Sequence, residues 1–165
     1  QSSVWLIFLN IIGFIIFYVS SIAKLNRTPF DLSEAESELV CGYHTEYSGM
    51  KFAMFFLGEY AELFVMSMLI VILFCGGYLP PFGFYLSDTI LANCWISKYI
   101  LYFEQTLWLF IKTLLIVFSI IWIRATFPRL TQRQTLNLFW KYLTPISIIN
   151  LIIILWLKEG FYSVF

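Results

Sequence analysis

The sequence has few charged residues for its length. Charged residues make up 12% of the 165 residues, against roughly a quarter in an ordinary globular protein. Acidic and basic residues balance at ten each, and no basic cluster indicates nucleic-acid binding. The shortage of charge excludes a typical soluble domain. Apolar residues reach 61% and the mean hydropathy is +0.84, which is typical of a chain that crosses a membrane.

Cysteine and histidine are too scarce to hold a redox cofactor within the chain. Cys41, Cys75 and Cys94 show no Cys-x-x-Cys spacing, and His44 is the single histidine. An iron–sulfur cluster needs about four cysteine thiolates, and a bis-histidine haem needs a pair of imidazoles, so neither fits. We therefore expect no metal site and no cofactor bound by this chain alone.

The N-terminal segment lacks the basic start and the cleavage site of a signal peptide. The first residue is Gln rather than Met, and residues 4–23 carry no charge. This stretch is long enough to span a bilayer, which takes roughly 20 apolar residues. We interpret it as a retained helix, in a chain that is either processed or a piece of a larger protein.

The remaining apolar runs predict an all-α membrane protein, a single membrane domain over residues 1–165 with about four transmembrane helices. The connections are an acidic loop with a short helix, an opposite-side loop with an interfacial aromatic segment, and a basic loop. The expected spans are residues 4–23, 52–75, 105–123 and 142–157, and the expected loops are residues 24–51, 76–104 and 124–141.

The basic residues predict the orientation of these spans. Loops 24–51 and 124–141 lie on the same side, because two spans separate them, and together they hold seven Lys and Arg residues. The other side holds only Lys98 and Lys158. By the positive-inside rule the acidic loop faces the cytoplasm or the matrix.

The acidic loop concentrates carboxylates between two apolar runs. Five lie within residues 31–46, and Ser33 with Glu36 matches a capping box that begins a short helix at about residues 34–41. That helix places Glu34 and Glu38 on one face. Carboxylates this close can relay protons where water is scarce. The alternative is a solvated acidic helix start, stabilised by the helix dipole.

Glu59 and Glu62 lie three residues apart inside the second expected span. A charged side chain at the centre of a span costs about 2.5–3.5 kcal/mol on insertion scales, so we expect Glu59 to face a protein-lined or hydrated interior. The alternative is an interhelical hydrogen bond without proton transport. Lys112, inside the third span, is a possible counter-ion, although its depth alone does not pair it with either carboxylate.

A second group of charges borders the same-side loops. Arg27 and Asp31 lie four residues apart, while Arg124 and Arg129 border the basic loop. Such opposite charges at a membrane surface can hold a polar headgroup or dock a soluble partner. The alternative for the arginines is anchoring at the membrane interface.

These motifs resemble one known family closely. The string RTPFDLSEAESELVCGYHTEYSG at residues 27–49, followed by GEY at 58–60, resembles subunit 1 of proton-pumping NADH:ubiquinone oxidoreductase, respiratory complex I. WIRATFPR at residues 122–129 resembles the family's next matrix-side motif, and the resemblance covers essentially the whole chain. Members of that family are roughly twice this length with about eight spans, of which this chain resembles the last four. A split subunit, completed by a chain with the first half, is the preferred explanation, and a fragment is the competing one.

The resemblance implies roles for individual residues. It assigns a proton path to Glu34, Glu36, Glu38 and Glu59. It assigns the ubiquinone chamber, or the interface with hydrophilic subunits, to Arg27, Asp31, Glu46, Tyr47, Arg124 and Arg129. Lys24 stands where the family often has Glu, which removes one relay carboxylate and offers a salt bridge to Asp31 or another acid.

The resemblance also implies the molecular setting. Ubiquinone is then the substrate, while FMN and the iron–sulfur clusters belong to partner subunits. The expected partners are the chain with the other half, the quinone-site hydrophilic subunits, the antiporter-like and small membrane subunits, and lipids, without nucleic acid. The expected location is the mitochondrial inner membrane with the acidic loop on the matrix side, with the bacterial plasma membrane as the alternative. Two other functions remain open at this point: a membrane subunit of an energy-converting hydrogenase, and a non-redox ion transporter or scaffold.

Overall fold

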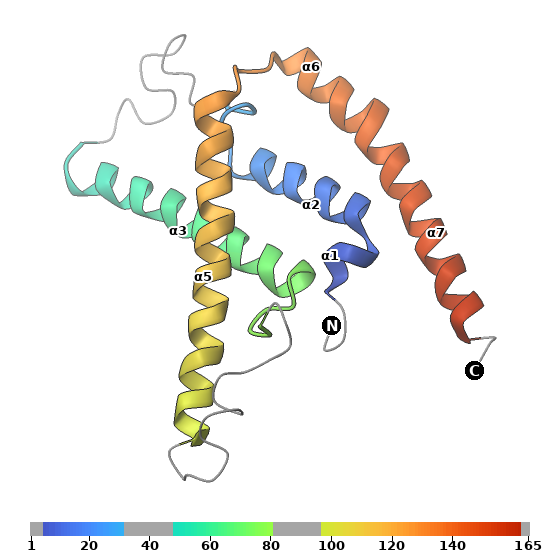
Figure 1. The fold of residues 1–165 in the computed structure, drawn as a ribbon. Helices are drawn as coiled ribbons and strands as arrows, with labels where there is room; N and C mark the ends of the chain where they lie inside the picture. Colours follow the sequence, from blue (N-terminus) through green and yellow to red (C-terminus); the bar gives the residue numbers. More distant parts are fainter. Residues whose placement is uncertain (1–4, 32–47, 81–96, 163–165) are drawn as a thin grey trace. The chain divides into compact units, whose positions relative to one another are not determined.

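The regular structure of the chain is helical throughout the part that can be described. A computed structural model describes residues 5–31, 48–80 and 97–162, and every element in these ranges is a helix (Figure 1). The chain divides into two compact units, residues 1–11 with 46–126 and residues 12–45 with 127–165. The single membrane domain expected over residues 1–165 stays a prediction.

The first unit contains α1 (Leu6–Leu9), α3 (Met50–Phe74) and α5 (Ser97–Thr126), with α3 packed against α5. Figure 1 shows α3 in green crossing the longer α5 in yellow and orange. Phe64 of α3 and Phe110 of α5 are in contact, with ring centroids 6.3 Å apart. The buried side chains of α3 recur at helical spacing on one face: Leu63, Met66, Ser67, Ile70, Val71 and Phe74.

Two glycines end α3. The chain turns after Phe74 through Gly76 and Gly77, whose φ angles are +71° and +55°. Left-handed backbone of this kind is unfavourable for residues with a Cβ atom, so glycine is the natural residue here. The N–H groups of Cys75 and Gly77 both donate to the Val71 carbonyl, which closes the last turn.

The second unit contains α2 (Ile11–Lys24), apart from its first residue, and the continuous helical stretch made of α6, η2 and α7. These three elements span Gln132–Asn137, Leu138–Leu143 and Thr144–Tyr162, and η2 is a π-helical turn. A capping box begins α6: the Thr131 side chain accepts from the third helical N–H, and Gln134 Oε1 accepts from the Thr131 N–H at 3.0 Å.

The helices differ from the expected spans at three places. Asn10 ends α1, so residues 4–23 do not form one continuous helix. Helix α5 begins at Ser97, although residues 97–104 were expected in the opposite-side loop. The last helix begins at Gln132, ten residues before the expected start, because the capping box outweighs the polar composition of that segment.

Pro145 does not end the last helix, since the π-helical turn precedes it. Proline lacks an N–H and clashes with the carbonyl four residues back in a regular α-helix. Here the Thr144 N–H donates to the Phe139 carbonyl five residues back, and Thr144 Oγ1 donates to the same oxygen at 2.8 Å. The wider turn lets the chain continue past Pro145 into α7.

Within the described residues, three helical stretches are long and apolar enough to cross a membrane: Met50–Phe74, Tyr99–Thr126 and Gln132–Leu157. Helix α2 is apolar as well but only 14 residues long. Buried hydroxyls inside the helices donate to carbonyls four residues back, as Ser67 does to Leu63 at 2.7 Å. The prediction of an all-α membrane protein is confirmed for the described residues.

Candidate functional site

Residues 29–31, in the first part of the acidic loop, contact residues 129–139 within the second unit. The Leu130 N–H donates to the Pro29 carbonyl at 2.9 Å. Phe30 is buried, with its ring centroid 5.5 Å from that of Phe139 in η2. We call this set, with the Asp31–Arg129 ion pair, the stem contact. It joins the start of the acidic loop to the basic segment, which are about 100 residues apart in the sequence.

The ion pair of the stem contact joins two of the predicted site residues. Arg129 Nη2 lies 3.4 Å from Asp31 Oδ2, and the two side chains are 34% and 14% exposed. Arg27 is buried at 7% exposure in the same turn, where its carbonyl accepts from the Phe30 N–H at 2.8 Å. Arg124 is exposed at the end of α5 in the first unit.

Breaking the Asp31–Arg129 pair is expected to have a small effect on stability. In a double-mutant cycle with Asp31→Asn and Arg129→Gln, we expect a coupling energy below about 1 kcal/mol that shrinks with added salt, because the pair is partly exposed. Thermal unfolding of the detergent-solubilised protein measures it. Arg133→Gln, the same charge change four residues further on, is the matched control. A coupling above about 3 kcal/mol, typical of a buried pair, would contradict this expectation.

The two carboxylates of α3 differ in exposure. Glu59 is half-buried and Glu62 is exposed, one helical turn further on. Glu59 is the tenth residue of the 25-residue helix, so it lies about 15 Å from the helix start. Both carboxylates therefore lie well inside a helix that is apolar enough to cross a membrane.

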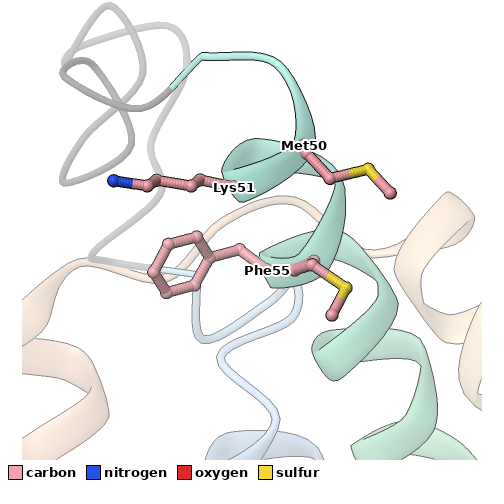
Figure 2. Close-up of a pocket in the computed structure, with 4 residues that line it drawn as sticks. Met50, Lys51 and Phe55 are labelled. Carbon is pink, nitrogen blue, oxygen red and sulfur yellow. The ribbon is translucent and has the colours of Figure 1, made fainter.

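The start of α3 borders an open hollow of about 440 Å³. Its lining residues are Met50, Lys51, Met54 and Phe55, which form two pairs at i and i+4. Figure 2 shows Lys51 and Phe55 extending from the helix in the same direction. The hollow is wide open rather than enclosed, and its wall is almost entirely apolar with one ammonium. It suits an apolar molecule that carries a hydrogen-bond acceptor.

Sequence reasoning missed this hollow, because four residues at the start of a span look like ordinary membrane-facing residues. It also left the partners of Lys112 open. The Lys112 ammonium donates to main-chain carbonyls just beyond α3, at 2.8 Å from Cys75 and 3.1 Å from Gly77. These partners follow from the position of Lys112 beside the end of α3, and only the tertiary structure shows that position.

Five predicted site residues lie outside the described residues: Glu34, Glu36, Glu38, Glu46 and Tyr47. The short helix expected at residues 34–41 lies outside them as well. Of the predicted residues that are described, Asp31 and Arg129 are brought together. Within residues 5–31, 48–80 and 97–162, no group of three or more His, Cys, Asp and Glu side chains is arranged to hold a metal ion.

Comparison with known proteins gives a consistent set of relatives. The family described as NADH dehydrogenase matches residues 1–155. NADH-quinone oxidoreductase subunit 8 of Rhodothermus marinus is 52% identical over 150 residues, which are 91% of this chain and 43% of that protein. An NADH-quinone oxidoreductase subunit of a Geobacillus species is 41% identical over 98% of this chain and 44% of its own length. NADH-ubiquinone oxidoreductase chain 1 of Chondrus crispus is 49% identical over 90% of this chain and 41% of its own length. The chain thus spans less than half the length of these relatives.

Proposed function

This chain belongs to the NADH dehydrogenase family, and from that premise we propose that it is a membrane subunit of a proton-translocating NADH:ubiquinone oxidoreductase. The observation that carries the proposal is the match over residues 1–155, together with relatives such as one 52% identical that is named as an NADH-quinone oxidoreductase subunit. Those names do not favour the hydrogenase and transporter alternatives.

The proposed roles are those that the family resemblance implies. Glu59 with the three acidic-loop carboxylates Glu34, Glu36 and Glu38 forms a proton path. The ubiquinone chamber, or its interface with hydrophilic subunits, is formed by Arg27, Asp31, Glu46, Tyr47, Arg124 and Arg129. The stem contact supports the second assignment, because it holds Asp31 beside Arg129 at the entry to the acidic loop.

The side chains that line the open hollow at the start of α3 match the chemistry of a quinone. A quinone ring carries two carbonyl acceptors and an apolar tail. Lys51 offers a donor at the rim, while Met50, Met54 and Phe55 offer apolar and aromatic surface. Thioether and aromatic side chains adapt readily to a flexible apolar chain.

The mechanism couples quinone chemistry to carboxylate protonation. Reduction of ubiquinone to ubiquinol takes up two electrons and two protons. FMN and iron–sulfur clusters on partner subunits would supply the electrons from NADH, and the carboxylate path would lead from the quinone toward the proton-pumping subunits. The change in charge at the quinone shifts the protonation of nearby carboxylates, and this interaction is strong where water is excluded. The perturbation then passes to antiporter-like subunits.

Exposed side chains within the candidate membrane-spanning helices support an assembly of several chains. Glu62 is exposed within α3, and in the stretch Gln132–Leu157 every side chain is at least partly exposed. The proposed partners are quinone-site hydrophilic subunits and other membrane subunits. The proposed location is the mitochondrial inner membrane, with the acidic loop on the matrix side as the excess of basic residues favours.

The test is the isolation of the intact assembly. Gentle detergent extraction, a native gel stained for NADH dehydrogenase activity, and mass spectrometry of every co-migrating chain identify the partners. We expect a very large active band that contains this chain with flavin- and iron–sulfur-binding subunits. A small complex without redox partners would refute the proposal.

A further inference from the structure

Lys112 is a buried cation in the middle of a membrane helix. It lies 15 residues from the start of α5 and 14 from its end, and its exposure is 8%. A charged side chain at such a depth requires polar partners within the protein. Sequence reasoning suggested a carboxylate of α3 as the partner. The contacts of the ammonium instead identify main-chain groups of the first unit.

Three carbonyl oxygens receive the Lys112 ammonium. Nζ donates to the carbonyls of Cys75 at 2.8 Å and Gly77 at 3.1 Å, and also to the carbonyl of Leu79. An ammonium has three N–H donors and no acceptor, so three converging carbonyls match its hydrogen-bonding capacity. All three belong to the short turn that follows α3.

An aromatic face completes the surroundings of the ammonium. Nζ lies 4.2 Å from the centroid of the Trp5 ring, within the distance of a cation–π interaction. The indole packs closely on the turn, since a Cβ atom added to Gly76 would lie 2.9 Å from Trp5 Cδ1. Trp5, the turn and α5 thus surround the charge on several sides.

The turn gains from these interactions because it follows a helix end. A helix leaves its last carbonyls without intrahelical partners, and the Lys112 ammonium supplies donors to this part of the chain. The left-handed Gly76 and Gly77 direct the chain so that alternate carbonyls, those of residues 75, 77 and 79, point to one place. The helix dipole also favours a positive charge at this end of α3.

We propose that the carbonyls of Cys75, Gly77 and Leu79, with the face of Trp5, form a binding site for a primary ammonium group, which Lys112 of α5 occupies in the native chain. The occupied site closes the end of α3 and ties it to α5. The charge of Lys112, rather than its bulk, holds the turn. The site therefore takes a free primary alkylammonium ion when the side chain is shortened.

Chemical rescue of Lys112→Ala in the assembled protein tests the proposal. The alanine retains the Cβ atom, and n-propylammonium supplies the missing three carbons and the nitrogen. The readout is the alkylation rate of the Cys75 thiol by N-ethylmaleimide, resolved by mass spectrometry, because Cys75 is a half-buried free cysteine within the turn. We expect labelling about tenfold faster or more in Lys112→Ala, because the loss of hydrogen bonds to a charged group opens the turn, and this outweighs the loss of a cation that favours the thiolate. Added n-propylammonium should slow labelling toward the wild-type rate.

Two controls separate charge from bulk. Propanol has a similar size without the charge, and tetramethylammonium has the charge without N–H donors, so neither should slow labelling. Thr113→Val alters the adjacent buried residue, whose hydroxyl bonds only locally to the Leu109 carbonyl at 2.8 Å, and should label at about the wild-type rate. An absence of rescue by n-propylammonium, or equal rescue by propanol, would overturn the proposal.

Lys112→Met provides the second test, should the alanine variant not accumulate in membranes. Methionine retains most of the length and bulk of the side chain but has no charge. Faster Cys75 labelling, or loss of Lys112→Met from membranes in which Thr113→Val accumulates normally, supports the ammonium site. Wild-type abundance and labelling of Lys112→Met would show that bulk suffices, and would overturn the proposal.

Discussion

Replacement of Glu59 by Gln is expected to lower quinone-dependent turnover by at least about tenfold while the assembly stays intact. Glutamine retains the size and most hydrogen bonds of the side chain but cannot exchange a proton, and positioned proton transfer contributes about 10²–10⁴-fold in enzymes. Glu59 is half-buried and about 15 Å into α3, where a carboxylate without a function would be disfavoured. The measurement is NADH:quinone reductase activity and proton uptake in sealed membrane vesicles.

Glu62→Gln is the matched control for this experiment. It makes the same chemical change one turn further along α3, on an exposed side chain, and is expected to reduce turnover less than Glu59→Gln does. NADH oxidation with a water-soluble acceptor that bypasses quinone should be unchanged in both variants, and native gels should show equal amounts of assembly. Wild-type pumping and quinone reduction in Glu59→Gln would remove Glu59 from the proton path.

Gly76→Ala is expected to destabilise the protein more than any other single methyl group added near the end of α3. Left-handed backbone costs an L-residue about 1–2 kcal/mol, and overpacking adds about 1–3 kcal/mol. Both apply here, since φ is +71° and the new Cβ atom would lie 2.9 Å from Cδ1 and 3.0 Å from Nε1 of Trp5. The rigid indole cannot yield easily, and its displacement would also disturb the contact with Lys112. Thermal unfolding of the solubilised protein measures the loss.

Gly77→Ala separates the two contributions. Its φ of +55° imposes comparable strain, but the nearest atom to its added Cβ is Ile72 Cα at 3.8 Å, an ordinary contact. We therefore expect Gly77→Ala to lose only the strain contribution. Combining Gly76→Ala with Trp5→Leu should destabilise less than the sum of the two single changes, because the leucine relieves the clash. Equal losses in Gly76→Ala and Gly77→Ala would show that the contact with Trp5 has no effect.

Composition predicts that the helices exist but not where they begin and end. Apolar runs predict membrane helices because lipid excludes other backbone structures, and that prediction needs no tertiary information. The ends of helices are harder to place. Residues 132–141 look like a polar loop, yet the Thr131 capping box begins a helix there. Asn10 and the π-helical turn before Pro145 are local features that a hydropathy pattern averages away.

The candidate site was also predictable from the sequence only in part. The acidic motif and Glu59 are recognisable from the sequence because intramembrane carboxylates are rare and costly. The pairing of Asp31 with Arg129 was not predictable, since their separation in the sequence gives no information on which of several nearby charges meet. Lys112 has the same limitation: its depth indicates a need for partners but does not distinguish a carboxylate from a carbonyl.

The sequence by itself determined that this is an α-helical membrane chain of the NADH dehydrogenase family, with seven of its ten carboxylates in one loop and one span. Composition and local motifs suffice for that, because the demands of a bilayer apply to each segment separately. Only the tertiary structure decided which contacts hold these segments in place. They are the stem contact at residues 29–31 and the hydrogen bonds from Lys112 to main-chain carbonyls. Such contacts depend on which helix ends lie close together in space. Every residue type has a main-chain carbonyl, so the identity of the residues that bind a side chain through their carbonyls does not reveal the contact.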